Sequence, residues 1–207
     1  MNRNSGAILV LSGPSGAGKS SLVAKIIDHI GPTYFSISTT TRPIREGEID
    51  GVHYHFVSVE EFKREIDEEM FLEYAVVHGN YYGTSLGAVK KALKEGKLVI
   101  FDIDVQGHDA VQNRLSDITT SVFVTTPTLE ELKRRLHSRS TDSEEVIAKR
   151  IEMAKREVQR ISEYDFLVVN DNLDEAAEVL ISIAKAARMK IPTLQMNEFV
   201  QSWEANA

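Results

Sequence analysis

The chain has 207 residues, 42% hydrophobic and 27% charged, which predicts one globular domain or one core that carries smaller inserted lobes. Its net charge of −7, from 24 basic and 31 acidic residues, argues against a sequence-independent nucleic-acid binder, because such a protein needs a basic surface. The chain has no cysteine, so it can form no disulfide, thiolate nucleophile or cysteine-ligated zinc site, and this suits a cytoplasmic location.

The first predicted element is a buried strand at residues 7–12, which contains the apolar run "AILVL". This run is too short for a signal-peptide core or a membrane span, so we expect no membrane association. A glycine-rich loop follows, and then Leu22, Ile26 and Ile30 recur at every fourth position, as on one face of a helix. Strand, glycine turn and helix together predict the start of a βαβ unit.

Residues 34–88 break this pattern and predict an inserted α+β lobe. Short strand-like pieces surround one helix-like segment, "VEEFKREIDEEM"; the pieces are "YFSIS", "VHYHF", "MFLEYAVV" and "NYYGTS".

The remaining chain alternates apolar runs with helical patterns. The apolar runs lie at 97–104, 119–127 and 165–171, and the helical patterns lie at 105–114, 128–138, 142–161 and 172–187. Continuous apolar runs are typical of parallel strands covered on both faces, so we predict a doubly wound α/β core. The polar stretch at 137–150, where Asp142 and Glu145 have capping-box spacing, predicts a helical lid.

We therefore expect a single domain, 1–207, made of four parts. These are a core at about 5–33, 89–136 and 151–187, an inserted lobe at about 34–88, a lid at about 137–150 and a tail at 188–207. In the tail, the apolar residues Met196, Phe199, Val200 and Trp203 are spaced as on one helix face. We expect them to dock on their own domain, with contact to a second subunit as the alternative.

The segment "GPSGAGKS" predicts a phosphate-binding loop, formed by Gly13, Pro14, Ser15, Gly16, Ala17, Gly18, Lys19 and Ser20. It lies between a predicted strand and a predicted helix, as such a loop requires. Backbone N–H groups and the helix N-terminus would hold phosphate oxygens, Lys19 would reach the β- and γ-phosphates, and Ser20 would ligate Mg²⁺. A glycine turn with a purely structural use is the alternative, but the context favours a nucleoside triphosphate site.

A carboxylate near that metal ion would complete the site. Asp102 ends the apolar run "LVIF", and we expect it to contact Mg²⁺ through water. Asp104, two residues later, would face the same side if the strand persists. The alternative is a polar strand end that meets solvent.

Arginines around the predicted lid are candidates for stabilising a transferring phosphoryl group, whose charge is spread over its oxygens. Arg135 and Arg139 share a helix face, and Arg150 lies off the apolar stripe of its helix. The alternative for Arg135 is a surface ion pair with Glu131, four residues earlier.

Arg42 and Arg45 lie on a loop and predict a site for a second phosphate, because arginine binds phosphate through two parallel hydrogen bonds. The hydroxyl-bearing residues that could join them are Ser38, Tyr54 and Tyr82. Surface pairing with Glu46 or Glu48 stays open as the alternative.

From about residue 7 to 187, the chain resembles the guanylate kinase family. The resemblance is carried, in this order, by "GPSGAGKSS", "STTTRPIREGEIDGVHY", "FLEY", "GNYYGTS", "FDIDVQG", "RRLHSRSTDSEEVIAKR" and "VVND". It implies a P-loop core, an inserted GMP-binding lobe and a helical lid.

The resemblance also implies roles for residues on the acceptor side. The GMP phosphate would be held by Arg42, Arg45, Tyr54 and Tyr82, and the guanine would be read by Glu73, Ser38 and Thr84. A carboxylate such as that of Glu73 can accept from both the N1–H and the N2–H₂ of guanine, and adenine offers no such pair of donors.

On the donor side, the resemblance implies that Arg139 and Arg150 close over the triphosphate, Arg135 helps near ATP, and Asn170 lies near the adenine. Asp102 and Asp104 would lie between the two nucleotides. The expected catalytic residues are Lys19, Arg45, Arg139, Arg150 and Asp102.

The implied reaction is Mg²⁺-dependent transfer of the γ-phosphoryl group of ATP to GMP or dGMP, giving ADP and GDP. Small-molecule substrates, no nucleic-acid partner, and a monomer or homodimer are expected. Two other function classes are a non-catalytic protein-binding module and a related kinase with another acceptor. Intact Lys19 and Ser20 argue against the first, and Glu73 argues against the second.

Overall fold

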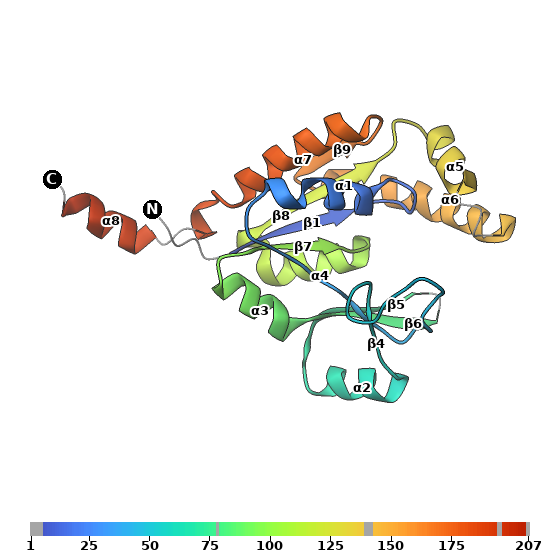
Figure 1. Ribbon diagram of the computed structural model, residues 1–207, viewed down its shortest axis with the longest axis horizontal. Helices are drawn as coiled ribbons and strands as arrows, with labels where there is room; N and C mark the ends of the chain where they lie inside the picture. Colours follow the sequence, from blue (N-terminus) through green and yellow to red (C-terminus); the bar gives the residue numbers. More distant parts are fainter. Residues whose placement is uncertain (1–5, 78, 139–142, 194–195, 206–207) are drawn as a thin grey trace.

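The core of the protein is a five-stranded parallel sheet. In the computed structural model, which describes residues 6–77, 79–138, 143–193 and 196–205, the strand order is β2-β7-β1-β8-β9 (Figure 1). The strands are β1 Ala7–Ser12, β2 Thr33–Phe35, β7 Leu98–Asp102, β8 Thr119–Thr125 and β9 Phe166–Val169. All neighbouring pairs are parallel, so the carboxyl ends of these strands meet at one edge of the sheet. The predicted α/β core is confirmed.

Helices cover both faces of this sheet (Figure 1). On one face lie α1 (Lys19–Ile26) and α7 (Leu173–Ala187), and on the other lie α3 (Leu86–Lys94) and α4 (Val105–Leu115). Because side chains alternate along a strand, Leu9 and Leu11 face the first helix pair, and Ile8 and Val10 face the second. All four are fully buried, which explains the continuous apolar run of β1.

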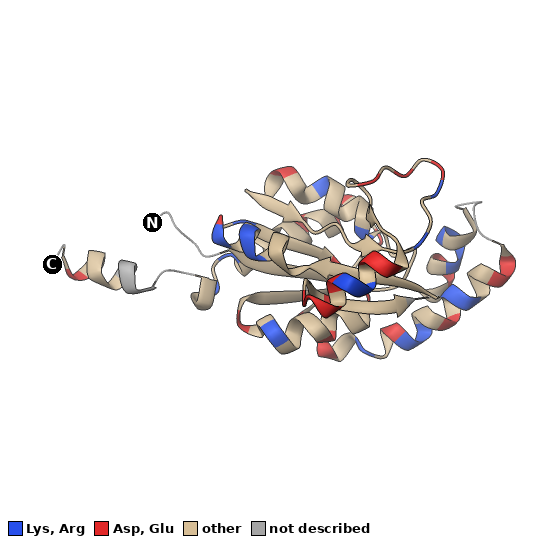
Figure 2. Ribbon diagram, turned by 90° about the horizontal axis from the view of Figure 1, so that it is seen from below, with Lys and Arg blue, Asp and Glu red and all other residues tan. Residues whose placement is uncertain are grey.

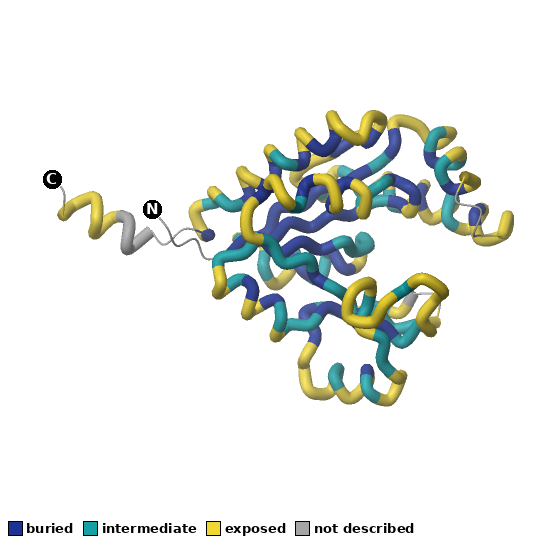
Figure 3. The backbone as a smooth tube through the Cα atoms, in the orientation of Figure 1, coloured by how far each residue is buried: buried dark blue, intermediate teal, exposed yellow. Residues whose placement is uncertain are grey.

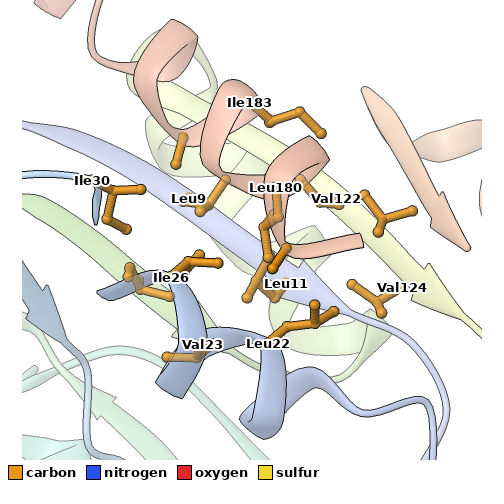
Figure 4. Close-up of a cluster of buried hydrophobic side chains, with 14 of the residues drawn as sticks. Leu9, Leu11, Leu22, Val23, Ile26, Ile30, Val122, Val124, Leu180 and Ile183 are labelled. Atoms are coloured by element: carbon orange, nitrogen blue, oxygen red, sulfur yellow. The ribbon is translucent and has the colours of Figure 1, made fainter. Parts of the chain in front are cut away.

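Figure 4 shows the first of these two cores, where Leu22 and Ile26 of α1 and Leu180 of α7 gather around Leu9 and Leu11. In Figure 3 the central strands β1, β7 and β8 are buried, whereas the outer sides of the covering helices are exposed. The rigid sheet therefore supplies a fixed edge from which loops can project.

A second, smaller sheet has the strand order β4-β3-β6-β5 and forms the inserted lobe. Its elements are β3 Thr39–Thr40, β4 His55–Phe56, β5 Phe71–Val77, β6 Asn80–Ser85 and the helix α2 Val59–Asp67. Phe62 of α2 stacks on Phe71 of β5, with ring centroids 4.4 Å apart. Ser58 caps α2 by accepting a hydrogen bond from the Glu61 N–H at 3.0 Å.

The start of this lobe differs from the expected residue 34. Strand β2 pairs with β7 in the core sheet, because Tyr34 and Phe35 pack against the two core clusters on opposite faces. The smaller sheet therefore begins at Thr39.

Helices α5 (Leu129–Ser138) and α6 (Glu144–Val158) form the pair predicted around residues 137–150. Leu132 and Leu136 of α5 pack against Ile147 and Ala154 of α6. Figure 2 shows basic and acidic segments alternating along α6. The N-cap of α6 is Ser143, whose hydroxyl accepts from the Val146 N–H, rather than the predicted Asp142, which lies outside the described residues.

The remaining described elements are short. Single 3₁₀ turns occur at Ile27–His29, Ser116–Ile118, Ile161–Glu163 and Ile191–Thr193, and the last helix is α8, Met196–Glu204. Figure 1 shows α8 apart from the rest of the domain, and Val200 and Trp203 are exposed rather than docked on the core as expected. The side chains of Met196 and Phe199 lie outside the part of the chain that is described. Across the described ranges, no helix has both the length and the apolar character needed to cross a membrane.

Gly83 of β6 tests how closely the inserted lobe is packed. A Cβ atom at this position would lie 2.8 Å from Phe71 Cδ1 and 2.9 Å from Phe62 Cζ. We expect Gly83→Ala to lower the free energy of unfolding by about 1–3 kcal/mol, because the two rings must shift. The matched control is Gly87→Ala in α3, where a Cβ meets nothing within 4 Å and stability should hold or rise slightly. Thermal denaturation of both variants checks this; equal melting temperatures would contradict it.

Candidate active site

A cavity of about 420 Å³ opens where the carboxyl edge of the parallel sheet faces the smaller sheet. Its lining brings together most of the predicted site residues, namely Gly13, Pro14, Ser15, Gly16, Gly18, Lys19, Ser20, Ser38, Tyr54, Glu73, Tyr82, Asp102 and Asp104. The core, the inserted lobe and helix α6 all contribute side chains. The predicted residues outside this lining that the structure describes are Ala17, Arg42, Arg45, Thr84, Arg135, Arg150 and Asn170.

The loop between β1 and α1 has a positive φ at Gly13, Gly16 and Gly18, and at two of these positions a side chain would also meet atoms behind the loop. Gly13 has a φ of +133°, and a Cβ there would lie 2.0 Å from the Val124 carbonyl oxygen. Gly18 has a φ of +91°, and a Cβ there would lie 2.3 Å from Asn170 Nδ2. Since a side chain is excluded at both positions, the loop packs closely on the core, and its glycines line the cavity without side chains.

Lys19 is the first residue of α1, and its side chain reaches back to the start of this loop. Its Nζ donates to the carbonyl oxygens of Gly13 at 2.6 Å and Pro14 at 3.4 Å, and it lies 3.7 Å from Asp102 Oδ1. Ser20, the next residue of α1, places its Oγ 3.5 Å from Asp102 Oδ2. The parallel pairing that aligns Leu11 with Asp102 brings this carboxylate to the first turn of α1.

Ser20 and Asp102 could serve as two oxygen ligands of a metal ion, and oxygen ligands fit a hard cation such as Mg²⁺. Such an ion typically binds one or two protein oxygens and fills its remaining positions with water and substrate phosphates. Among the residues that the structure describes, no group of three or more His, Cys, Asp or Glu could enclose a metal.

Asp104 lines the cavity as predicted, but it is not part of a strand. Strand β7 ends at Asp102, so the strand alternation does not extend to Asp104. Instead, Asp104 is the N-cap of α4, and its Oδ1 accepts from the N–H groups of Gln106 and Gly107 at 3.0 and 2.9 Å. Both carboxylates nevertheless line the same cavity.

Glu73 is a largely buried carboxylate on β5. It lies opposite Thr84 of β6 in the antiparallel ladder, and Thr84 Oγ1 donates to Glu73 Oε1 at 2.5 Å. Burial raises the pKa of Glu73 above that of an ordinary glutamate, the Thr84 hydrogen bond lowers it, and the nearby charge of Asp104 raises it further. The site thus holds a hydrogen-bond acceptor away from water.

Arg42 and Arg45 are both tied to Glu48. Arg42 Nη2 lies 2.7 Å from Glu48 Oε1, and the backbone N–H of Arg45 donates to Glu48 Oε2 at 2.8 Å. The hydrogen bond from Arg42 lowers the pKa of Glu48, and Arg42 also lies over the rings of Tyr54 and Phe56 at 5.3 and 5.6 Å. The alternative of an ion pair with Glu48 is therefore observed for Arg42, although the pair is mostly buried rather than on the surface. The side chain of Arg45 is exposed.

The donor-side arginines also have protein partners. Arg135 Nε donates to Glu131 at 2.6 Å, which is the ion pair that the sequence analysis gave as the alternative. Hydrogen bonds from Arg134 and Arg135 lower the pKa of Glu131 to about 2. Arg150 Nη1 donates to Ser15 Oγ at 2.8 Å and so reaches the phosphate loop. Arg139 lies outside the described residues.

Asn170, expected near an adenine, is buried and donates from Nδ2 to the Ala17 carbonyl at 2.8 Å. This contact supports the phosphate loop from behind.

Glu157 of α6 lines the cavity and was not selected from the sequence. Burial raises its pKa, while the positive charge of Lys19 lowers it. Glu157 follows Arg150 by seven residues, or two helical turns, so both lie on the same side of α6. That spacing is the signal by which it could have been found. The other lining residues that were not predicted are Ser21, Ala75 and Ile103.

A family model described as guanylate kinase matches residues 5–187. The chain belongs to the guanylate kinase family. Members of this family phosphorylate GMP with ATP and use a divalent metal ion.

Similar proteins agree over nearly the whole length. A guanylate kinase of Sulfurimonas denitrificans is 72% identical over 204 residues, covering 99% of each chain. A guanylate kinase of Wolinella succinogenes is 53% identical, covering 99% of this chain and 95% of the other. The crystal structure of a guanylate kinase from Anaplasma phagocytophilum matches with a TM-score of 0.80 and 30% identity, covering 98% and 97% of the two chains.

Because its pKa is raised in the folded protein, Glu73 should lower the stability of the nucleotide-free enzyme at neutral pH. Above that pKa, folding transfers a negative charge from water into the site. Below the pKa of an unfolded glutamate, about 4.3, both states are protonated and this cost disappears. Glu73→Gln should therefore raise the melting temperature at pH 7, and the gain should shrink towards pH 4.

Glu46→Gln, on the exposed loop, is the matched control and should change the melting temperature little at either pH. A loss of stability in Glu73→Gln at pH 7 would show that the carboxylate stabilises the fold.

Proposed function

We propose that phosphoryl transfer from ATP to GMP takes place in the cavity between the two sheets. The observation that carries this proposal is that one cavity is lined both by the phosphate loop with Lys19 and by the buried carboxylate of Glu73. Asp102 and Asp104 lie on the wall of the same cavity. The first group suits a triphosphate, the second suits a guanine, and the distance between them is spanned by a single pocket.

On the donor side, backbone N–H groups of residues 13–18 and the N-terminus of α1 would bind the phosphates of ATP. Lys19 would exchange its carbonyl partners for β- and γ-phosphate oxygens. Arg150 already contacts Ser15 in this loop, so it is placed to offset charge on the transferring group, and we propose the same for Arg139. Arg135 and Asn170 would contribute at the nucleoside end.

Ser20 would ligate Mg²⁺ directly, and Asp102 would hold it through water. When bound, the ion would neutralise charge on the β- and γ-phosphates. The contribution of the chain is to hold the hydroxyl and the carboxylate side by side and to keep Lys19 within reach of both.

On the acceptor side, Arg42, Arg45, Tyr54 and Tyr82 would grip the phosphate of GMP. The guanidinium of Arg42 lies against the Tyr54 ring, and the Tyr54 and Tyr82 rings are 6.0 Å apart, so three of these side chains converge. The guanidinium groups of Arg42 and Arg45 would reduce the repulsion between the two phosphate groups. The acceptor is already an oxyanion, so no strong general base is needed.

Glu73, Ser38 and Thr84 would read the base. The carboxylate of Glu73 would accept from N1–H and N2–H₂ of guanine, while Thr84 fixes its position. Asp104, held rigidly as a helix cap, would lie near the acceptor.

We further propose that the smaller sheet with α2 acts as the GMP lobe and that α5 and α6 act as the lid. Closure would exclude water, which otherwise hydrolyses ATP. A cytoplasmic location and a monomer or homodimer complete the proposal; dGMP would be a second acceptor.

Lys19→Met tests the donor side. Without the ammonium group, kcat should fall about 100- to 1000-fold, because the developing charge loses a pre-positioned cation. Lys25→Met is the control, since Lys25 lies on the same helix but pairs with the exposed Asp174. A coupled ADP-production assay gives both values. Near-normal kcat in Lys19→Met would remove the argument from the phosphate loop.

Glu73→Gln tests the acceptor side. The amide would present a donor towards guanine, so kcat/KM for GMP should fall about 100-fold or more, while the KM for ATP changes little. The same assay with GMP, dGMP, AMP and UMP side by side measures the preference of both proteins. An equal loss of affinity for GMP and ATP would show that Glu73 has only a structural role.

A further inference from the structure

Strand β5 is the place where the inserted lobe is joined to the core. The ring of Phe71 belongs to the lobe, where it stacks on Phe62. The side chain of the next residue, Leu72, is 2% exposed and packs in the core cluster that contains Ile8, Val10 and Val99. The chain therefore passes from one packing unit to the other within a single peptide step, and Glu73 follows immediately.

The strand is irregular at this step. Phe71 pairs with Ser85 and Glu73 pairs with Thr84, so Leu72 is an extra residue in the ladder between β5 and β6. A bulge of this kind re-aims the side chains that follow it and leaves backbone groups without partners in the ladder. Near a packed core, such a carbonyl oxygen needs a donor from elsewhere.

Arg114 supplies that donor from the last turn of α4. Its Nη1 donates to the Leu72 carbonyl at 2.5 Å and lies 3.5 Å from the Phe71 carbonyl, 42 and 43 residues away in the chain. The N-cap at the other end of this helix is Asp104, which lines the cavity. Helix α4 thus contacts the site through its N-cap and the bulge of β5 through its last turn.

We propose that Arg114 is a positioning residue for guanine recognition, which acts by fixing the bulge at Leu72 and hence the place of the Glu73 carboxylate. It does not touch the nucleotide. The proposal rests on the proposed base-reading role of Glu73, and it adds a residue of the core to the determinants of specificity.

A purely local role is the competing explanation. A cation in the last turn stabilises a helix through its dipole wherever its head group lies. That role requires no contact with another strand, whereas Arg114 directs its guanidinium to the two carbonyl groups at the lobe–core step. The two explanations differ in what they predict for GMP.

The test compares Arg114→Gln with Arg114→Lys and Glu73→Gln. Steady-state kinetics are measured with GMP, with IMP, which lacks the exocyclic amino group, and with ATP varied at saturating GMP. Arg64→Gln is the matched control, because it removes the same charge from an exposed residue of the lobe. The guanidinium of Arg64 lies 3.6 Å from the carboxylate of Glu61. Thermal denaturation of each variant is recorded alongside.

We expect Arg114→Gln to raise the KM for GMP about five- to tenfold and to reduce the preference for GMP over IMP. The effect is this small because only part of the energy of the lost charge-assisted hydrogen bond would affect the position of Glu73. The KM for ATP should stay unchanged. Arg114→Lys keeps a donor for the Leu72 carbonyl, so it should restore the KM for GMP to within about twofold. Arg64→Gln should match the parent enzyme.

An unchanged KM for GMP, or equal rises for GMP and ATP, would overturn the proposal, as would a lower melting temperature with normal GMP preference. If Arg114→Gln fails to fold, Arg114→Met, which keeps the length of the side chain and removes the donor, decides by the same ratio of KM values: a rise for GMP alone supports the proposal, and an unchanged ratio overturns it. The failure of the base-reading role is recognised separately, because Glu73→Gln would then keep the preference for GMP over IMP.

Discussion

The site depends on the parallel pairing of β1 with β7. The register aligns Leu11 with Asp102, so that the strand-end carboxylate lies beside the first turn of α1 rather than in solvent. The same pairing continues from β1 to β8, where the Val124 carbonyl closes against Gly13. A shift of one residue between β1 and β7 would turn the side chains of β7 to the opposite faces and move the carboxylate away from the loop. The packing of the core and the assembly of the site are thus one constraint.

Local sequence patterns predicted much of this arrangement. The strands β1, β7, β8 and β9, the helices other than α3 and the phosphate loop lie where apolar runs and glycine spacing predicted them, because these signals reflect burial and backbone freedom within a few residues. Helix α3 was not predicted. The features that differed depend on contacts between distant segments. Strand β2 joined the core sheet because of its partner β7, and β7 ended before Asp104, which became a helix cap.

Side-chain partners were the least predictable part of the site. The spacing of Arg42 and Glu48 allowed their pairing without distinguishing it from the alternatives, and the only sequence signal of Glu157 is its spacing of two helical turns from Arg150. Ser143 rather than Asp142 caps that helix, since the residue in extended conformation just before the first turn has its hydroxyl in reach of the Val146 amide. Each of these outcomes is decided by distances of a few ångströms across the fold.

The ion pair between Arg42 and Glu48 changes what it means for a phosphate to bind there. The guanidinium is already ordered by a carboxylate, two aromatic rings and a backbone carbonyl. Much of the entropy cost of fixing a long side chain is therefore met during folding. On the proposed role of Arg42, a phosphate would compete with the Glu48 carboxylate for the guanidinium, so weakly charged anions would bind there less well.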